Sequence, residues 1–547
     1  MIRYKSSKQL SIEEFRTPFE IRLDKNNRWV KLSRILPWDE LADVYYSKLS
    51  SSMGAPSIDA RIVIGAMIVK HKLKLDDREA IEHIRENPYV QYFLGKSDYS
   101  YEDIFDRSLF TALRYRMGEQ EFDQLNSILI EKAEDIENTG KVGGNKKGKA
   151  SAISSQQQQS QESEPKQSPL EPNQAEQHKN KGKLILDATV ADQMIVYPTD
   201  LGLLNTSREE SERIIDALHT ITGEKKKPRT YRKRARKQYL SIAKKKSKTK
   251  KEIRKGIGQQ LNYLKRNINS IHKQLDKIEK QGGIGWRLSK RDQKIFWVIQ
   301  QIYLQQQEMY KNNIHSIADR IVNIYQPHVR PIVRGKEKVN VEFGAKLGVS
   351  LHHGFARINT FSWDAYNESS DLKKQVEDYK TIHSYYPEAV LTDTIYGTRE
   401  NRAFLKEHNI RFVGKPLGRP IQTPLTYYQK RKQQKERNQR NHIEGKFGQG
   451  KNGYNLNKIR ARQQRTSESW VSCIFFVMNI IALVKLYAKM GTDFLFGSYF
   501  LSLVKIIEEK VCGFPQKKIL LQPCRKINLN YFDLFTKPYL NLKNEFL

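Results

Sequence analysis

The chain has 547 residues, with 96 Lys and Arg against 61 Asp and Glu and a formal net charge of +35. A field of this sign attracts polyanions, so nucleic acid is the first partner to consider. Hydrophobic residues make up 38% of the chain, which excludes a wholly disordered basic tail and allows more than one folded domain. The cysteines Cys473, Cys512 and Cys524 lack the even number and close pairing of a disulfide framework or zinc knuckle.

This cysteine usage fits a reducing compartment, and we expect a cytoplasmic protein. The first residues, MIRYKSSKQLSIEEF, have no apolar core of the kind that a secretory signal needs. The most apolar stretch, residues 470–484 (WVSCIFFVMNIIALV), is shorter than the roughly 20 residues that a bilayer requires and contains Ser472 and Asn479. We therefore expect a buried core helix there and no membrane partner.

Residues 1–138 are predicted to form a helical, DNA-binding domain. After Pro56, apolar residues recur at helical spacing through IDARIVIGAMIVKHKL. Asp76 and Glu79 then form a capping box for a helix that ends before Pro88. Short helices of this kind suit a DNA-binding bundle, and they suit any other helical domain equally well. Two further helices are expected at 106–117 and 119–135.

The composition changes sharply after these helices. Residues 139–182 are rich in Gly, Ser, Gln, Lys and Pro, which predicts a low-complexity linker. From 183 to 485 we expect an α/β domain, because short β-favouring runs alternate with helical patterns. Residues 486–547 form a tail whose role no motif assigns. The expected strands lie in KLIL, VRPIVRG, KLGVSLHHGF, ARINTFSWD, AVL and residues 411–413, and residues 428–466 are expected to be helical and basic.

A large helical insertion at about 207–330 concentrates the positive charge. Between Lys225 and Lys255 there are 17 Lys or Arg and one acid, Glu252, so about +16 of net charge lies in this run. A localisation tag or a solvated helix face is the simpler interpretation of such a run. The density of the charge favours contact with a phosphate backbone. Our candidate DNA-binding residues here are Arg232, Arg234 and Arg236.

Three carboxylates stand out by their position. Asp187 and Asp393 each follow a short apolar strand that we expect to end at the acid, and Glu444 lies in the basic helical segment HIEGKFGQGK. Acids held by two strand ends and a helix can bind two divalent ions that promote phosphoryl transfer. Each acid also has a simpler interpretation: Asp187 could cap a turn, Asp393 could begin the loop TIYG, and Glu444 could pair with Arg440 one turn earlier. Taken singly, none of the three identifies a catalytic site.

Taken together, the motifs around these acids resemble one family. ILDAT at 185–189, LTDTIYGTRENR at 391–402 and RNHIEGKFGQGKNGY at 440–454 are similar to the three acidic motifs of DDE transposases from bacterial insertion sequences. PTDLGLLN, RPIVRGKEKVNVEFGAK and SWDAYNE are also similar. So is the N-terminal stretch ARIVIGAMIVKHKLKLDDREAIEHIRENPYVQYFLG. The resemblance covers most of residues 40–485.

The resemblance implies a fold and an activity. The implied fold is a ribonuclease-H-like α/β domain, a mixed sheet interrupted by the helical insertion and preceded by an all-α N-terminal domain. The implied catalytic residues and metal ligands are Asp187, Asp393 and Glu444, acting with Mg²⁺ or Mn²⁺ in DNA cleavage at transposon ends and strand transfer into target DNA. The implied partner is double-stranded DNA, bound by a homodimer or higher oligomer, and no nucleotide cofactor is expected.

The basic residues around Glu444 follow the family spacing in part. Related transposases often show Tyr, two residues, Arg, three residues, Glu, six residues and Lys. Arg440, Glu444 and Lys451 fit this spacing, whereas Arg437 occupies the Tyr position and could supply a charge-based phosphate contact instead. The candidate DNA-binding residues of this segment are Arg437, Arg440, Lys446 and Lys451.

Several alternatives remain open at the level of the sequence. A nuclease of the same fold that does not join strands, or a non-catalytic DNA-binding derivative of a transposase, would show similar motifs. Asp364, at a predicted strand end, is the acid that most rivals the three chosen ones. His352 and His353 are adjacent on a predicted strand and so point to opposite faces, which argues against one shared ion. The glycines of GKFGQGK lack the preceding strand and the Lys-Ser/Thr ending of a nucleotide-binding loop.

Overall fold

The structure, a computed structural model, describes residues 22–50, 52, 54, 56–142, 180–280, 288–333, 341–415, 418 and 426–511, with side chains described outside 137–142 and 490–511. Most of the predicted linker and tail therefore lies outside the described residues. The chain divides into two compact units, Met1–Ala488 and Lys489–Leu547. The domain boundaries expected from the sequence stay predictions.

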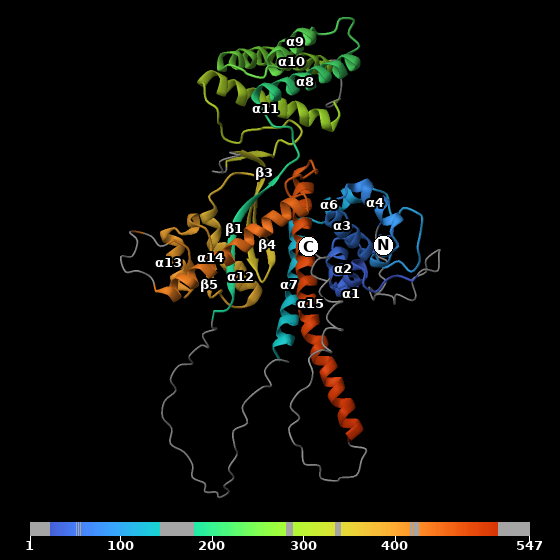
Figure 1. Ribbon diagram of the computed structural model, residues 1–547. Helices are drawn as coiled ribbons and strands as arrows, with labels where there is room; N and C mark the ends of the chain where they lie inside the picture. Colours follow the sequence, from blue (N-terminus) through green and yellow to red (C-terminus); the bar gives the residue numbers. More distant parts are fainter. Residues whose placement is uncertain are drawn as a thin grey trace, which may run out of the picture. The chain divides into compact units, whose positions relative to one another are not determined.

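Helices α1 to α7 occupy the described residues before 143 (Figure 1). The capping box predicted at Asp76 is confirmed: its side chain accepts the Glu79 backbone N–H at 2.9 Å, and the Glu79 carboxylate accepts the Asp76 N–H at 2.7 Å. A new helix begins at Pro88, because the fixed φ of proline suits the first helical position. The bounds are α1 Arg28–Ile35, α2 Trp38–Tyr46, α3 Ala60–Leu73, α4 Asp77–Glu86, α5 Pro88–Phe93, α6 Ser108–Arg116 and α7 Glu119–Val142.

A mixed sheet with β1 (Lys183–Asp192) inside it forms the centre of the α/β region. In the described part of the chain the strand order is β2-β3-β1-β5-β6, and β4 also pairs with β3. β1 runs antiparallel to β3 and parallel to β5. The mixed α/β class and the order of strands expected from the sequence are confirmed. The other strands are β2 Arg330–Val333, β3 Val341–His352, β4 Phe355–Ser362, β5 Ala389–Leu391 and β6 Arg411–Val413.

Different helices cover the two faces of β1. Leu184 and Leu186 pack in one apolar cluster with residues of α12 (Asp371–His383). The residues that alternate with these leucines along the strand point to the opposite face, namely Lys183, Ile185 and Asp187. There the Lys183 ammonium donates to the Gln439 side chain of α14 (Tyr427–Gly448) at 2.9 Å. The alternation of β1 therefore separates an apolar face under α12 from a polar face under α14.

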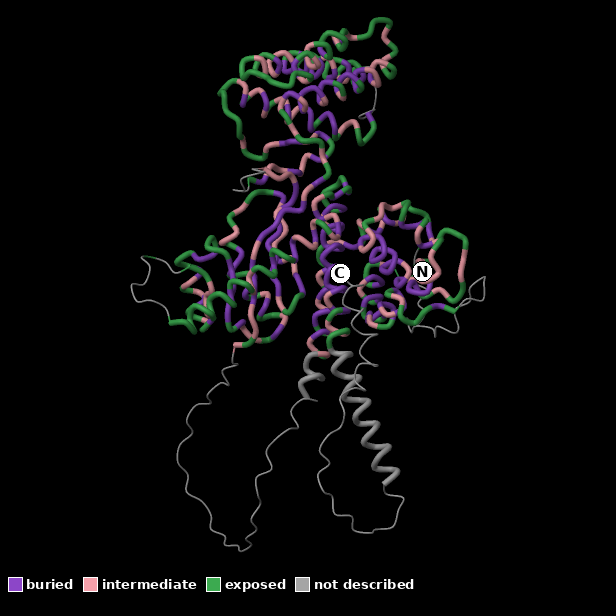
Figure 2. The backbone as a smooth tube through the Cα atoms, viewed as in Figure 1, coloured by how far each residue is buried: buried purple, intermediate pink, exposed green. Residues whose placement is uncertain are grey.

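Between β1 and β2 the described residues form helices, in the region where the sequence predicts a helical insertion. It consists of α8 (Asp200–Thr222), α9 (Arg232–Ala243), α10 (Lys250–Lys280) and α11 (Lys290–Asn312). Residues of α8, α10 and α11 and of the segments beside them share an apolar cluster whose members all lie between Leu203 and Ile324. Figure 2 shows buried residues along the inner sides of these helices and exposed residues on the outer sides. The insertion therefore has a hydrophobic core of its own.

The segment after β6 differs from the expected continuous helix at 428–466. α14 ends at Gly448, a π turn η4 (Gln449–Gly453) follows, and α15 (Gln464–Val511) begins only at Gln464. The backbone of Asn455 is left-handed with φ 57°, and the Gly450 carbonyl accepts the N–H groups of both Tyr454 and Leu456. A left-handed residue and N–H groups that bond back to a carbonyl of the last helical turn are typical of a helix C-terminus. The helical prediction for residues 454–463 was therefore wrong. Between β4 and α14 lie η2 (Glu368–Ser370), α12, η3 (Thr394–Tyr396) and α13 (Arg399–Glu407).

The apolar stretch at 470–484 forms part of α15. Over Gln464–Lys489 this helix is long and apolar enough to cross a membrane, and 72% of its apolar window is buried inside the protein. Its one fully buried amide, Asn479, accepts the Ala356 N–H at 2.9 Å and donates to the Ala356 carbonyl at 2.7 Å on β4. The same amide donates to Asn126 of α7. Burial and these contacts agree with the expected core helix.

Candidate active site and nucleic-acid interface

The parallel pairing of β1 and β5 brings two of the predicted acids to the same level of the sheet. Ile185 pairs with Leu391, the last residue of β5. Asp187 and Asp393 each follow two residues later. α14, which carries Glu444, contacts both strands on the face to which Asp187 points. Three segments far apart in the sequence thus converge on one face of the sheet.

Asp187 does not end its strand as expected. β1 continues through Ala188 and Val190 to Asp192, and Asp187 pairs with Val349 of β3 in the middle of the ladder. The residues after Asp187 are small or β-branched and alternate in a way that suits a strand, so the ladder has no reason to stop at the acid. Asp187 is therefore held in the ladder with β3, whereas Asp393 lies beyond the last residue of β5.

The electrostatic setting of Asp187 is that of a partly buried acid among other acids. Burial is the main influence that raises its pKa to about 6, and the carboxylates of Glu368 and Glu444 act in the same direction. A hydrogen bond from the Ala188 N–H at 2.8 Å and the charge of Arg440 act in the opposite direction. A cation bound nearby would therefore stabilise the ionised form of Asp187.

The other two predicted acids are more exposed. The Asp393 side chain caps η3 by accepting the Thr394 N–H at 2.6 Å. The Glu444 side chain is 55% exposed and pairs with Arg440 at 3.0 Å, as one of the simpler interpretations of the sequence anticipated. Within the described residues, the group of side chains whose ligand atoms lie close enough to share one ion does not include Asp187, Asp393 or Glu444. These three carboxylates therefore approach the same face without all being within reach of a single ion. Their oxygen donors are nevertheless of the type that Mg²⁺ prefers.

Glu368 is an acid near this site that the sequence did not single out. It begins η2, pairs with Lys346 at 3.0 Å, and contributes to the raised pKa of Asp187. Glu368 is the last residue of the stretch SWDAYNE, which resembles the family. The sequence therefore contained a motif at this position, but Glu368 does not directly follow a predicted strand as Asp187 and Asp393 do. Asp364, the rival acid of the same stretch, is 71% exposed and lies 3.5 Å from Arg330.

The basic residues expected near Glu444 are not equivalent. Arg437 is exposed on α14 and Arg440 is half-buried in its pair with Glu444. The Lys446 ammonium is buried and donates to the Gly354 carbonyl at 2.9 Å, and burial lowers its pKa to about 8. Lys451 pairs with Glu342 at 3.3 Å and with Asp192 at 3.7 Å. This geometry gives no support to a DNA contact by Lys446, and the acids near Lys451 offset its charge.

The three arginines expected to bind DNA in the insertion all lie on α9. Arg234 and Arg236 are exposed. Arg232 makes a two-pronged contact with Asp216 of α8, at 2.7 and 3.1 Å, which raises the pKa of its guanidinium. Arg234 and Arg236 are thus better placed to meet a phosphate than Arg232 is.

Comparison with known proteins identifies two regions of similarity. Residues 390–483, which include Asp393 and Glu444, match the family described as "Transposase DDE domain". Residues 17–116 match the family described as "Transposase domain (DUF772)".

The chain is also 29% identical over 119 residues to the "Uncharacterized protein ORF8 in nfe locus" of Rhizobium meliloti. This similarity covers 22% of the chain and 57% of that relative. No solved structure matches the chain. The two transposase-domain matches, one over the N-terminal helices and one over the segment that carries Asp393 and Glu444, support an insertion-sequence DDE transposase.

Proposed function

We propose that this transposase cleaves DNA at the ends of its own element and joins the freed 3′ hydroxyl to target DNA. The observation that carries the proposal is the pairing of Ile185 with Leu391, which sets Asp187 and Asp393 at one level beneath the helix of Glu444. This arrangement supports a site for phosphoryl transfer. The match of residues 390–483 to a transposase DDE domain supports the same activity.

We also propose that the sheet is a ribonuclease-H-like core. Its support is the order of the strands, in which β1 lies between an antiparallel β3 and a parallel β5, with α12 and α14 on opposite faces. The helical insertion between β1 and β2 then interrupts this core without entering the sheet.

Asp187, Asp393 and Glu444 are the proposed ligands of Mg²⁺ or Mn²⁺. Ions held there would activate a water or a 3′ hydroxyl and stabilise the leaving oxygen of an in-line displacement. A cation would compete with Arg440 for the Glu444 carboxylate, and an Arg440 guanidinium released in this way would be available to a DNA phosphate. The pair therefore links metal binding to DNA binding.

The proposed partner is double-stranded DNA, bound in the cytoplasm by a homodimer or higher oligomer. Arg437 on α14 and the exposed arginines of α9 are the proposed phosphate contacts. The net charge of +35 supports such contacts, which make binding strongly dependent on salt.

The test compares two acid substitutions in the purified full-length chain. Asp393→Asn is expected to abolish cleavage of a duplex that carries the element's end in the presence of Mg²⁺, because it removes a proposed metal ligand. Asp364→Asn, at the exposed rival acid, is expected to leave cleavage close to wild type. Wild-type cleavage by Asp393→Asn would sink the assignment, and loss of cleavage only in Asp364→Asn would transfer the role to that acid.

The products distinguish transposition from simple cleavage. When unlabelled plasmid is added, a transposase gives products in which the labelled end is covalently joined to the plasmid, whereas a nuclease gives cut ends only. A non-catalytic derivative gives neither product while still binding the duplex. Joined products that are absent from Asp393→Asn are the expected result.

A further inference from the structure

A second group of metal-ligating side chains lies on the opposite face of the sheet from Asp187. Glu134 of α7, His352 at the end of β3 and His383 at the end of α12 each offer one ligand atom, and these atoms all lie within 4.8 Å of one another. Ile185 pairs with Leu351, so the next pair, Leu184 and His352, faces α12 rather than α14. The group is therefore separate from the three acids of the proposed catalytic site.

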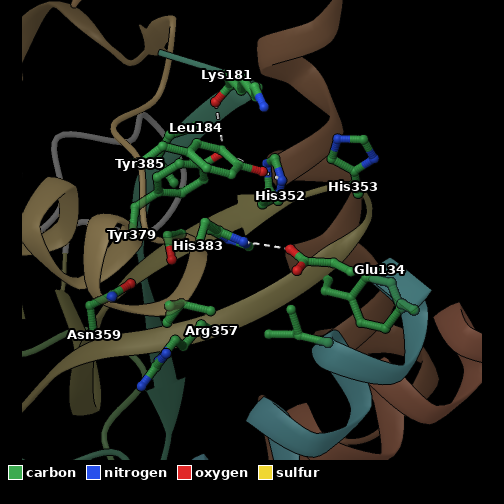
Figure 3. A pocket seen from close by; sticks show the side chains of 16 residues that line it. Glu134, Lys181, Leu184, His352, His353, Arg357, Asn359, Tyr379, His383 and Tyr385 are labelled. Atoms are coloured by element: carbon green, nitrogen blue, oxygen red, sulfur yellow. Dashed lines mark hydrogen bonds and ion pairs between the residues drawn. The ribbon is translucent and has the colours of Figure 1, made fainter. Parts of the chain in front are cut away.

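These side chains line a cavity of about 400 Å³ (Figure 3). In Figure 3 Glu134 reaches toward the cavity from α7, while His352 and His383 approach from the sheet and α12. The His383 side chain is 3% exposed and its Nδ1 lies 2.5 Å from a Glu134 carboxylate oxygen. A buried imidazole nitrogen this close to a carboxylate needs a positive charge between the two, supplied by a proton or by a metal ion.

The hydrogen bonds of His352 leave one ring nitrogen available as a ligand. Its Nδ1 lies 3.1 Å from the Lys183 carbonyl, which can only accept, so Nδ1 carries the proton and Nε2 the lone pair. The nearest hydroxyl, that of Tyr379, lies 3.5 Å from Nε2 and already donates its proton to the Lys181 carbonyl at 3.0 Å. A ring fixed by a backbone carbonyl on one nitrogen, with the other nitrogen free, is the usual state of a metal-binding histidine.

The donor set indicates the kind of ion. Two imidazoles and one carboxylate suit Zn²⁺ and similar transition metals, whereas Mg²⁺ prefers oxygen ligands. Ligand atoms around a tetrahedral Zn²⁺ lie about 3.3 Å apart, so the side chains need only small rotations from their present separation. Three protein ligands leave a fourth position for water, which the cavity can hold.

We propose that Glu134, His352 and His383 bind one Zn²⁺-type ion that joins α7 to the sheet and to α12. Two contacts in the described residues already link α7 to the sheet without metal: an ion pair between Asp123 and Arg357 of β4, and a hydrogen bond between Asn126 and Asn479 of α15, whose amide also bonds Ala356 of β4. The ion adds a third link, near the C-terminal end of α7. The proposed role of this ion is structural, because the proposed catalytic ions bind on the other face of the sheet.

The test measures Zn²⁺ binding by calorimetry on the chelator-treated, dialysed full-length chain in the presence of excess Mg²⁺. The wild type is expected to bind one Zn²⁺ per chain. His383→Ala and Glu134→Gln are expected to weaken binding by about 100-fold or more, because each removes one of three ligands. Glu134→Gln is nearly isosteric, so it distinguishes loss of a ligand from loss of the fold. Equal far-UV circular dichroism of the metal-free proteins verifies this point.

Two controls locate the ion. His315→Ala removes an exposed histidine of the insertion and is expected to keep wild-type Zn²⁺ binding. Asp393→Asn is also expected to keep it, because Mg²⁺ and Zn²⁺ are assigned to different faces. Zn²⁺ should raise the melting temperature of the wild type and of both controls, but not that of Glu134→Gln. A wild type that binds no Zn²⁺, undiminished binding by His383→Ala, or loss of binding in Asp393→Asn would each overturn the proposal.

Discussion

Asp187 is an acid whose surroundings oppose its charge. It is partly buried in the middle of β1, and Glu368 and Glu444 add negative charge nearby. In the absence of a cation, the ionised form therefore costs free energy that an exposed aspartate would not cost. Catalytic and metal-binding acids are often held in such positions, because the ligand offsets the cost when it binds.

This cost predicts a pH-dependent gain in stability for Asp187→Asn. The pKa of Asp187 is raised from 3.8 to about 6, so the folded chain binds more protons than the unfolded chain between these values, and the free energy of unfolding falls as pH rises through them. Asparagine stays neutral. The variant should therefore be more stable than wild type by about 3 kcal/mol at about pH 7.5, and by much less at about pH 4.

Urea unfolding in the presence of a chelator measures this difference at both pH values. Asp364→Asn makes the same chemical change at an exposed position and is expected to alter stability far less. An Asp187→Asn variant that is less stable than wild type at neutral pH would contradict the electrostatic interpretation of the site.

Some of these residues could be predicted from the sequence and others could not. Asp187 and Asp393 follow apolar β-favouring runs, a local pattern that a single sequence displays. The group of Glu134, His352 and His383 has no local pattern, because its members come from α7, β3 and α12. The expectation that His352 and His353 point to opposite faces was wrong, because His353 lies beyond the end of β3 with φ 47° and the two ring centroids lie 4.2 Å apart. The partners of His352 in this group come from other elements.

At the scale of elements, α9 carries two exposed arginines of the basic run that we propose as DNA contacts. Arg234 and Arg236 are exposed, whereas the charge of Arg232 is offset by Asp216. The sequence could locate the basic run and its helical character. It could not separate paired from exposed arginines, because Asp216 lies on the preceding helix.

Salt dependence should separate these arginines. The double variant Arg234→Ala/Arg236→Ala is expected to reduce the slope of log K against log salt concentration for duplex DNA by about 1 to 2, since each lost phosphate contact contributes about 0.9. Arg232→Ala is expected to change it less. Fluorescence anisotropy over a series of salt concentrations measures the slope.

Arg213 provides a control of equal charge. It lies on α8 and pairs with Glu210 and Asp292. Arg213→Ala removes one positive charge that two carboxylates already pair, so its slope should stay near that of the wild type. If Arg213→Ala and the α9 variants change the slope equally per charge, net charge alone governs binding and α9 is not a specific contact.

At the scale of the whole molecule, the insertion between β1 and β2 has a hydrophobic core separate from that of the α/β region. Its apolar cluster contains only residues of α8, α10, α11 and the segments beside them. The buried Arg208 is satisfied within the same region by the side chains of Glu212, Asn205 and Gln260. None of these partners belongs to the sheet.

This self-contained core predicts that residues 198–326 fold when expressed alone. The fragment should show helical circular dichroism and a cooperative thermal transition, because its buried groups find their partners inside it. Gln260→Leu, which leaves a buried Arg208 nitrogen without its acceptor, should lower the melting temperature of both the fragment and the full chain. A fragment without a cooperative transition would contradict the prediction.

The pairing of β1 with β5 also sets an order of events during synthesis. Asp187 and Asp393 are 206 positions apart in the sequence, and ribosomes add roughly 5 to 20 residues per second, so Asp187 waits on the order of 10 to 40 s for its partner strand. During that interval the N-terminal helices and the whole insertion have emerged and can fold through local contacts. The nascent chain therefore acquires its basic helices before its acidic site can assemble, and α14, which carries Glu444, completes that site last.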